Sequence, residues 1–389
     1  MSEGVLERTT DGDHVAPAAR ARLRPRWLSP DILRGARWAA IVIWAFALAN
    51  QIYFGGVPFD RTGQLFWIAL GLMAASIGKR ALWTVVVDFL PLALVLIAYD
   101  YLRGLSETLG MPTWWTPQLN VDRILFFGHV PTLVLQEHLK YPTVRWWDVA
   151  VCICYVSFFF LPYVTAGVLW LRHRRDFYRW SLRFVALSFL GFVLFALIPS
   201  APPWAAAQCS AAQVAEHPAE PACINTAPTS KLHGGLLGPY HPSVPGAHPF
   251  VERIAVRGFS ELHLSVARSL VEEGQGAVDP VAAVPSLHAG GTMLFVIFMW
   301  TRVRRWWRPV LASYPVLMLF SLAYSGEHYV SDQLAGWLCA ALVCVVASRI
   351  ERRRKRRRAP DTLESPTPET VETSCPPIQP PPETTRSSI

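Results

Sequence analysis

The stretches AAVPSLHAGG at residues 282–291 and SGEHYVSDQLAG at residues 325–336 each stand at the start of a long apolar segment. Each carries polar and ionisable side chains where a membrane-spanning helix would ordinarily have apolar ones. Ionisable residues at such positions are rare and are functional by default. These two stretches therefore indicate both a membrane fold and the place where its chemistry is expected.

The residue types in these stretches fit a phosphoryl transfer. On a helix, the four-residue spacing of His328 and Asp332 places both side chains on one face, about 6 Å apart along the axis. The carboxylate then holds the imidazole in one tautomer and leaves its other nitrogen as a nucleophile or base. His288 follows Pro285 and an expected helix cap at Ser286, a position suited to a phosphate. We expect His328 to attack phosphorus, Asp332 to orient it and His288 to protonate the leaving oxygen.

Each stretch also has a structural alternative. A histidine at a membrane boundary is commonly an ordinary interfacial residue, and an acid four residues later can simply support it. The functional interpretation is favoured because the two stretches fall on the same membrane side in the topology given below.

The motifs resemble those of the type 2 phosphatidic acid phosphatase superfamily, especially its inositolphosphotransferase branch, which includes inositol phosphorylceramide synthases. The residues that match two of its signatures are Pro285, Ser286 and His288 for Pro-Ser-x-His, and Ser321, His328 and Asp332 for Ser-Arg-x5-His-x3-Asp. Leu322 stands where the classical phosphatases have Arg, and their Lys-x6-Arg-Pro signature has no clean copy. The resemblance implies the same catalytic roles for His288, His328 and Asp332, and it leaves the phosphate-clamping cations unassigned.

The composition is that of an integral membrane protein. Of the 389 residues, 52% are hydrophobic and 16% are charged, whereas soluble proteins carry roughly 25% charged residues. The net charge of +8 comes from basic residues clustered in short loops and tails, which indicates membrane topology rather than nucleic-acid binding. No Cys/His spacing resembles a zinc site and no acidic cluster suggests a metal, so we expect no metal and no cofactor.

We expect an all-α polytopic fold with about eight transmembrane helices, a six-helix catalytic core and interfacial helices. The expected spans are 37–55, 64–78, 81–101, 148–171, 181–199, 284–300, 309–325 and 329–350. The 105–147 connection is rich in Trp and predicts either an interfacial belt or short helices lying on the membrane. An amphipathic helix is expected within 249–274.

The chain divides into a basic cytoplasmic tail at 1–36, a transmembrane catalytic domain at 37–350 and a tail at 351–389 that is disordered by composition. The domain includes a long external loop at 200–283. In this loop Cys209 and Cys223 either form a disulfide or remain free thiols.

The positive-inside rule orients the chain. The segments expected inside are all basic: the N-terminal tail, 78–80, 171–179, 301–308 and 351–358. Both termini are then cytoplasmic in a multi-pass plasma-membrane protein. His288 and His328 both lie at the external face, where two helix N-termini are expected to point at one phosphate.

Candidate substrate-binding residues are those that could reach a phosphate at this face: Ser286, Arg103, Lys140 and Arg145. Arg103 has a structural alternative as an ordinary boundary residue. Lys140 and Arg145 lie just before the fourth span, where the resemblance would place the Lys-x6-Arg-Pro signature, but their spacing does not match it. Asp88, inside the third span, is interpreted as a structural partner of Lys79 or Arg80.

The sequence therefore predicts a metal-independent enzyme that acts on a phospholipid or a polyprenyl phosphate through a phospho-histidine. Transfer of a polar headgroup such as phosphoinositol is favoured. A lipid phosphate or polyprenyl diphosphate phosphatase is the alternative, and a non-catalytic lipid transporter is a further one. The oligomeric state has no signal in the sequence.

Overall fold

The computed structural model describes residues 29–58, 61–105, 111–217, 222–225, 234–262 and 282–358. Within these ranges the chain is helical, and the only β-type pairing is a pair of isolated bridges that join Trp114, Ser200 and Ala282. The chain falls into two units, residues 1–344 and 345–389. The first unit contains the helix bundle and the candidate site.

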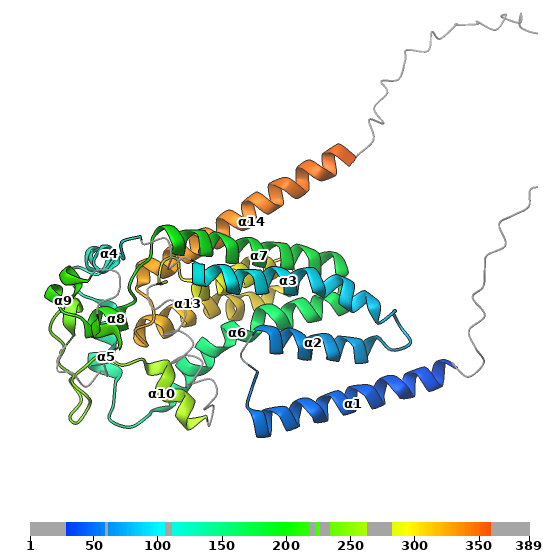
Figure 1. Cartoon of the computed structure of the whole chain (residues 1–389), viewed down its shortest axis with the longest axis horizontal. Coiled ribbons are helices and arrows are strands. Elements are labelled where there is room, and N and C mark those ends of the chain that lie inside the picture. The colour runs from blue at the N-terminus through cyan, green and yellow to red at the C-terminus, as the bar shows by residue number, and fades with distance from the viewer. Residues whose placement is uncertain are drawn as a thin grey trace, which may run out of the picture. The chain divides into compact units, whose positions relative to one another are not determined.

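A helix forms at each of the expected spans, which confirms the predicted all-α polytopic fold (Figure 1). These helices are α1 (Pro30–Gly55), α2 (Arg61–Ser76), α3 (Trp83–Leu105), α6 (Trp146–Arg172), α7 (Arg174–Leu197), α12 (Leu287–Met299), α13 (Arg308–Tyr324) and α14 (Val330–Arg358). By length and composition, α1, α6, α7 and α14 can each cross a membrane, and α2, α3 and α12 contain shorter apolar helices.

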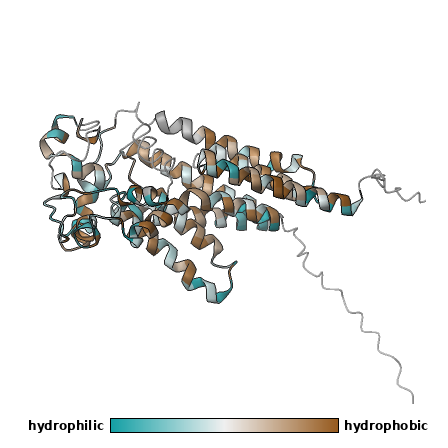
Figure 2. Ribbon diagram, turned by 90° about the horizontal axis from the view of Figure 1, so that it is seen from below, coloured by the Kyte–Doolittle hydropathy of each residue, from teal (hydrophilic) through white to brown (hydrophobic). Residues whose placement is uncertain are grey.

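Short helices gather at one end of the bundle, on the left in Figure 1. They are α4 (Pro117–Leu125), α5 (Pro131–Leu139), α8 (Pro203–Gln208), α9 (Ala211–Glu216) and α10 (Ile254–Glu261). The described residues also form the 3-10 turns η2 (Ala222–Asn225), η3 (Gly235–Leu237) and η4 (Arg305–Trp307). Figure 2 shows mainly hydrophobic residues along the long helices and a more mixed set of residues at this end. Short helices thus form where 105–147 predicts them. Within 249–274 a helix forms at α10, and residues 263–274 lie outside the described ranges.

Local sequence explains where the helices begin. Ser29 accepts a hydrogen bond from the Ile32 amide and is followed by Pro30, so α1 starts with a side-chain cap and a proline at its first position. Proline also opens α4, α5 and α8. Prolines inside α3, α6 and α13 are compatible with helices that pack within a membrane bundle.

The main core lies between α2, α3, α6, α7, α12 and α14. Trp170 of α6, Trp180 of α7 and Leu294 of α12 are each at most 1% exposed within it. Burying an aromatic side chain of this size contributes on the order of 2–3 kcal/mol. These contacts hold α12 against α6 and α7 and so fix the helix that carries His288.

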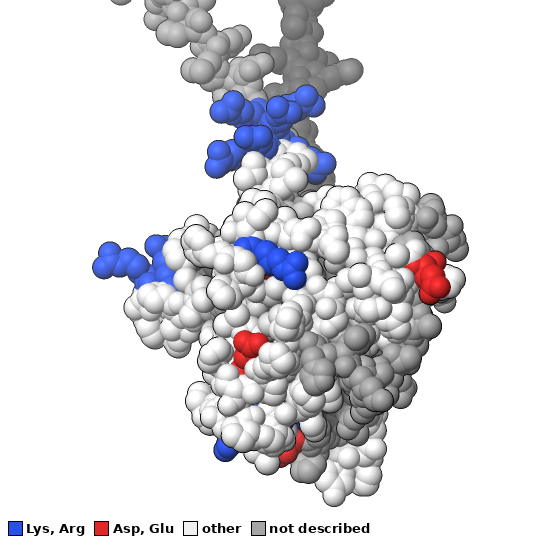
Figure 3. All heavy atoms as spheres, turned by 90° about the vertical axis from the view of Figure 1, so that its left-hand side faces the viewer, with Lys and Arg blue, Asp and Glu red and all other residues white. Residues whose placement is uncertain are grey.

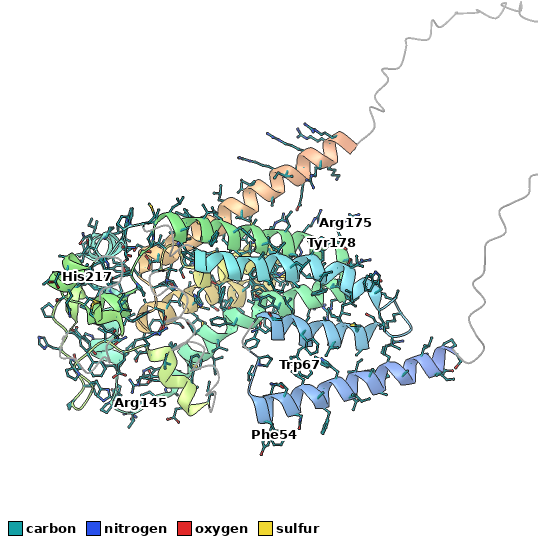
Figure 4. The ribbon with its side chains drawn as sticks, viewed as in Figure 1. Phe54, Trp67, Arg145, Arg175, Tyr178 and His217 are labelled. Atoms are coloured by element: carbon teal, nitrogen blue, oxygen red, sulfur yellow. A yellow bond between two sulfur atoms is a disulfide. The ribbon has the colours of Figure 1, made fainter. Side chains whose placement is uncertain are left out.

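The partner predicted for Asp88 is wrong. Its carboxylate accepts hydrogen bonds from Arg174 Nε at 2.7 Å, from the Trp170 indole at 2.6 Å and from the Tyr178 hydroxyl at 2.5 Å. Arg80 instead donates to the Trp170 carbonyl at 3.0 Å. Asp88 therefore ties α3 to the α6–α7 turn, a contact between segments far apart in sequence. Tyr178 lies at the opposite end of the bundle from Arg145 (Figure 4).

Helices α12 and α14 meet closely through two glycines. A Cβ added to Gly336 would lie 2.2 Å from the Ser286 carbonyl oxygen, and one added to Gly290 would lie 3.0 Å from the Gly336 carbonyl oxygen. Small residues at such a crossing let two backbones approach in a membrane bundle. The crossing lies within about one turn of His288 and Asp332, so it sets the spacing of the candidate site.

The long loop is covalently closed. Cys209, directly after α8, forms a disulfide with Cys223, with Cα atoms 5.4 Å apart. Of the two alternatives left open by the sequence, the structure has the bonded one. Both cysteines are buried beside Trp115 and Trp204, so the disulfide belongs to the packed layer under the short helices.

Candidate active site

His288 lies in the first turn of α12, against three aromatic rings of α6. Its ring centroid is 4.9 Å from that of Tyr155, 4.4 Å from Phe158 and 5.6 Å from Phe159. Residues three and four apart share a helix face, so α6 presents these rings as one surface. The Ser286 hydroxyl accepts a hydrogen bond from the Ala289 amide at 3.3 Å, as expected for the helix cap. The aromatic surface and the cap together fix the position of the His288 ring.

His328 lies opposite, in the segment between α13 and α14. Its ring centroid is 5.6 Å from that of His288. A reactive atom can be approached from about 3–3.5 Å by a catalytic group, so this separation lets both rings reach one phosphoryl group. His328 is 7% exposed and Asp332 is fully buried.

Asp332 stands beside His328, as the four-residue spacing predicts. His328 Nδ1 and Asp332 Oδ2 are 3.8 Å apart, which is longer than a hydrogen bond. Catalytic hydrogen bonds are often long without substrate and shorten in the reacting complex. The same Oδ2 accepts the Tyr329 amide at 3.0 Å, so Asp332 also caps the start of its own helix.

The expectation that the first amides of α14 point at a phosphate is wrong. Asp122 of α4 accepts the Val330 amide at 2.9 Å and the Ser331 amide at 2.8 Å. With Asp332 on the Tyr329 amide, two carboxylates already occupy the positive end of this helix. Asp122 is 1% exposed. Burial raises its pKa and the two amide hydrogen bonds oppose that shift.

Backbone hydrogen bonds join the two histidine segments. The Ser286 amide donates to the Asp332 carbonyl at 3.0 Å. The Val284 amide donates to the Ser200 hydroxyl at 2.9 Å, and the Trp204 amide donates to the Gly326 carbonyl at 2.9 Å. The proline-rich segment after α7 thus connects the chain before α12 to the chain before α14. The separation of the two histidines is therefore built into the backbone.

Burial sets the protonation state of His328. Removal from water lowers the pKa of its imidazole to about 4, while nearby Glu327 and a hydrogen bond with the Ala283 backbone partly oppose the shift. His328 is therefore neutral at pH 7, and only the neutral ring has a lone pair with which to attack phosphorus.

The structure places Lys140 and Arg145 apart from the histidine pair in their described contacts. Lys140 is fully buried, donates to the His248 carbonyl at 2.8 Å and to the Phe250 carbonyl, and lies 3.8 Å from Glu252. Burial lowers the pKa of Lys140 to about 8, with Glu252 opposing the shift. Arg145 is exposed and stacks on Tyr141, with its guanidinium carbon 4.4 Å from the ring centroid.

Two other predicted substrate-binding residues lie at helix ends. Arg103 is in the last turn of α3, and its side chain lies outside the described part of the structure. Ser286 is buried at the start of α12, next to the histidines. Binding of substrate by Ser286, Arg103, Lys140 and Arg145 stays a prediction, as do the catalytic roles of His288, His328 and Asp332.

Three charged residues of the site were missed by sequence reasoning. Asp122 closes α14, and Arg253 forms a two-pronged ion pair with Glu327, the residue before His328. No local motif marks Asp122 or Arg253 because their partners are far away in sequence. Glu327 had a signal that was not used, since it is an acid directly before a candidate catalytic histidine.

The surface at this end carries few charges. Figure 3 looks onto the end with α4, α8 and α9. Where atoms are described, the middle of this view shows a few separate charged side chains, and Lys and Arg gather at its top and left edges. Among the described residues, no three His, Cys, Asp or Glu side chains are grouped as metal ligands would be.

Comparison with known proteins gives two matches. Residues 119–346 match the family model of the PAP2 superfamily. The chain is 27% identical over 293 residues to the phosphoinositol dihydroceramide synthase of Bacteroides thetaiotaomicron, covering 72% of this chain and 82% of the relative. No solved structure matches. The matched region begins in α4 and contains Asp122 and both histidines.

Proposed function

Because this chain belongs to the PAP2 superfamily and is a membrane phosphotransferase or phosphatase, we propose that it transfers a polar phospho-headgroup between lipids through a phospho-histidine. Phosphoinositol is the favoured headgroup, since the curated relative is named for making phosphoinositol dihydroceramide. The donor is then a phospholipid and the acceptor a lipid alcohol.

One observation carries this proposal: the rings of His288 and His328 face each other at 5.6 Å, with the buried Asp332 behind one of them. Such a pair has a nucleophile on one side of a phosphoryl group and a proton donor on the other. The neutral state of His328 and the aromatic surface behind His288 support this division of roles.

In the first step, a ring nitrogen of His328 attacks phosphorus and the bond from phosphorus to the lipid oxygen breaks. His288 gives its proton to that oxygen, so the lipid leaves as an alcohol. Asp332 stabilises the positive charge that His328 gains. His288 must be protonated for this step, and the negative charge of the bound phosphate favours that form.

In the second step, His288, now neutral, removes a proton from the acceptor hydroxyl, whose oxygen attacks phosphorus and releases His328. The proton count is restored and no redox partner is needed. Water in place of the lipid alcohol would turn the same site into a phosphatase. The acceptor that reaches His288 therefore decides between transfer and hydrolysis.

We further propose that the site faces the external side of the plasma membrane, with both termini cytoplasmic. The Cys209–Cys223 disulfide supports this orientation because disulfides persist in oxidising compartments. The basic connections 171–179 and 301–308 support it through the positive-inside rule.

The test uses the purified full chain in detergent with phosphatidylinositol, phosphatidic acid or polyprenyl diphosphate, each with and without a lipid alcohol such as dihydroceramide. We expect mass spectrometry to detect the acceptor lipid carrying the transferred headgroup, and only in reactions that contain the acceptor. Release of phosphate without acceptor would overturn transfer in favour of hydrolysis. His328→Ala is expected to abolish turnover, and unchanged turnover would remove the proposed nucleophile. His288→Ala is expected to lower turnover by about 10²–10⁴-fold.

A further inference from the structure

Phosphoryl transfer needs cations or donors aimed at the non-bridging oxygens, because catalysis of this reaction is largely electrostatic. Leu322 stands where related phosphatases have an arginine, and it is fully buried in an apolar cluster. Its carbonyl oxygen accepts the Glu327 amide at 3.0 Å. The position therefore shapes the chain before His328 and supplies no charge.

Arg253, which forms an ion pair with Glu327, places a cation in this same region. Arg253 Nε donates to Glu327 Oε1 at 2.8 Å and Nη2 donates to Oε2 at 3.0 Å. Glu327 is 5% exposed and directly precedes His328 in the chain. The guanidinium carbon is also 4.8 Å from the centroid of a Trp204 ring, and the Trp204 amide bonds to Gly326. Arg253 is thus held against the segment that carries the nucleophile.

Hydrogen bonds from Gln136 and Lys140 fix the backbone just before Arg253. Gln136 of α5 exchanges two hydrogen bonds with the Glu252 backbone, accepting its amide at 3.0 Å and donating to its carbonyl at 2.7 Å. It also donates to the Tyr324 carbonyl at 2.8 Å. Lys140 holds the carbonyls of His248 and Phe250 just upstream. Two buried polar side chains of one short helix region therefore fix the backbone before Arg253.

Other described cations at this end have structural contacts elsewhere. Arg123 donates to the Leu237 carbonyl at 3.0 Å. Arg257 donates to the Tyr141 carbonyl at 2.8 Å and lies 3.3 Å from Glu252. Arg253, in contrast, bonds to Glu327 in the 325–328 segment through both prongs of its guanidinium.

We propose that Arg253 is the phosphate-clamping cation of this enzyme, and that Glu327 holds it until a substrate phosphate takes its place. The inference rests on the proposed function. A carboxylate and a phosphate present similar pairs of oxygens to a guanidinium, so the same fork fits either. When Arg253 turns to the phosphate, Glu327 is left beside His328 and faces the positive charge that the ring gains on attack.

The test compares the two halves of the ion pair. Arg253→Gln, Arg253→Lys and Glu327→Gln are assayed in the full-length protein for headgroup transfer, for inhibition by orthovanadate as a probe of the phosphoryl site, and for thermal unfolding in detergent. Arg257→Gln is the matched control, since it removes a cation of the same layer that has no proposed contact with phosphate.

A clamp predicts an asymmetric result. Arg253→Gln should lower turnover by about 10²–10³-fold and weaken vanadate inhibition by at least about tenfold, with Arg253→Lys falling between it and the wild type. Glu327→Gln should keep vanadate inhibition, because the arginine remains. Arg257→Gln should leave both readouts unchanged even if it unfolds at a lower temperature.

A purely structural ion pair predicts instead that Arg253→Gln and Glu327→Gln lose stability and vanadate inhibition alike, and that result would overturn the inference. Arg253→Gln that folds and retains full vanadate inhibition would also overturn it. If His328→Ala is inactive while Arg253→Gln is fully active, the inference fails and the proposed function stands. If His328→Ala is fully active, the proposed function itself fails.

Discussion

The two helices that carry the candidate catalytic residues begin in different ways. Helix α12 is closed by its own Ser286, three residues from the amide that it caps. Helix α14 is closed partly by its own Asp332 and partly by Asp122, which lies 208 residues earlier in the chain than Val330. One start is local, and the other requires the short helices outside the bundle.

This difference shows that the two histidines are held by different means. His288 is placed by its own helix turn and by the rings of α6, so its position follows from the bundle. His328 lies before the first turn of α14, and its position depends on Asp122, on Arg253 through Glu327 and on the hydrogen bond at Gly326. The connections between the long helices therefore build half of the site.

The largest effect should come from breaking the contact at which the two helix starts meet. Gly336→Ala puts a Cβ 2.2 Å from the Ser286 carbonyl oxygen, so the helices must separate at a cost of about 3 kcal/mol. Thermal unfolding in detergent measures this loss, and transfer activity should fall with it. Gly35→Ala on α1 is the control, since no atom lies within 4 Å of its added Cβ. Equal unfolding temperatures for the two variants would contradict the close crossing.

Acid should act on the α14 side through His328. Its pKa is lowered from 6.5 to about 4 in the folded chain, so between these values the unfolded chain binds the extra proton. Stability is then fully present above pH 6.5 and is lost as the pH falls toward 4, by on the order of 2–3 kcal/mol. In His328→Asn, the unfolding temperature should fall less than in the wild type as the pH is lowered from 6.5 to 4. The same acid sensitivity in wild type and variant would show that Glu327, Asp332 or another group is responsible.

The smallest effect should be the difference in stability lost when the cap of α14, Asp122, or the cap of α12, Ser286, is removed. Asp122→Ala strands two buried amides at the start of α14 and should cost about 2 kcal/mol, whereas Ser286→Ala should cost about 1 kcal/mol. Urea titration in detergent or thermal unfolding can rank them. Asp122→Asn retains one acceptor oxygen and should lie between Asp122→Ala and wild type. A Ser286 variant less stable than the Asp122 variant would reverse the comparison.

The long helices and the pairing of the histidines could be predicted from the sequence because their signals are local. Apolar runs mark the helices, a Pro-Ser pair marks the start of α12, and the four-residue spacing marks one helix face for His328 and Asp332. The charge of short connections then places both starts on one side of a membrane. Each of these signals spans a few residues or follows a general rule of composition.

The charged contacts could not be predicted in the same way. Arg253 meets a partner 74 residues away, and Asp88 meets Arg174 across 86 residues. Lys140 is a candidate phosphate ligand from the sequence, and that role stays a prediction. The structure shows that Lys140 is buried and bonds to backbone carbonyls. A cation near a site in sequence can serve the fold, and only the packed chain shows which carbonyl or carboxylate it meets.

The position of Asp122 also sets the order in which the enzyme becomes competent during synthesis. The ribosome makes α4 early and α14 last among the described helices, and the carboxylate of α4 has no α14 amides to hold until then. A nascent chain that ends before residue 332 does not contain Asp122, His328 and Asp332 together. On the proposed mechanism, a growing chain already inserted among lipids therefore cannot act on them until the start of α14 has been made.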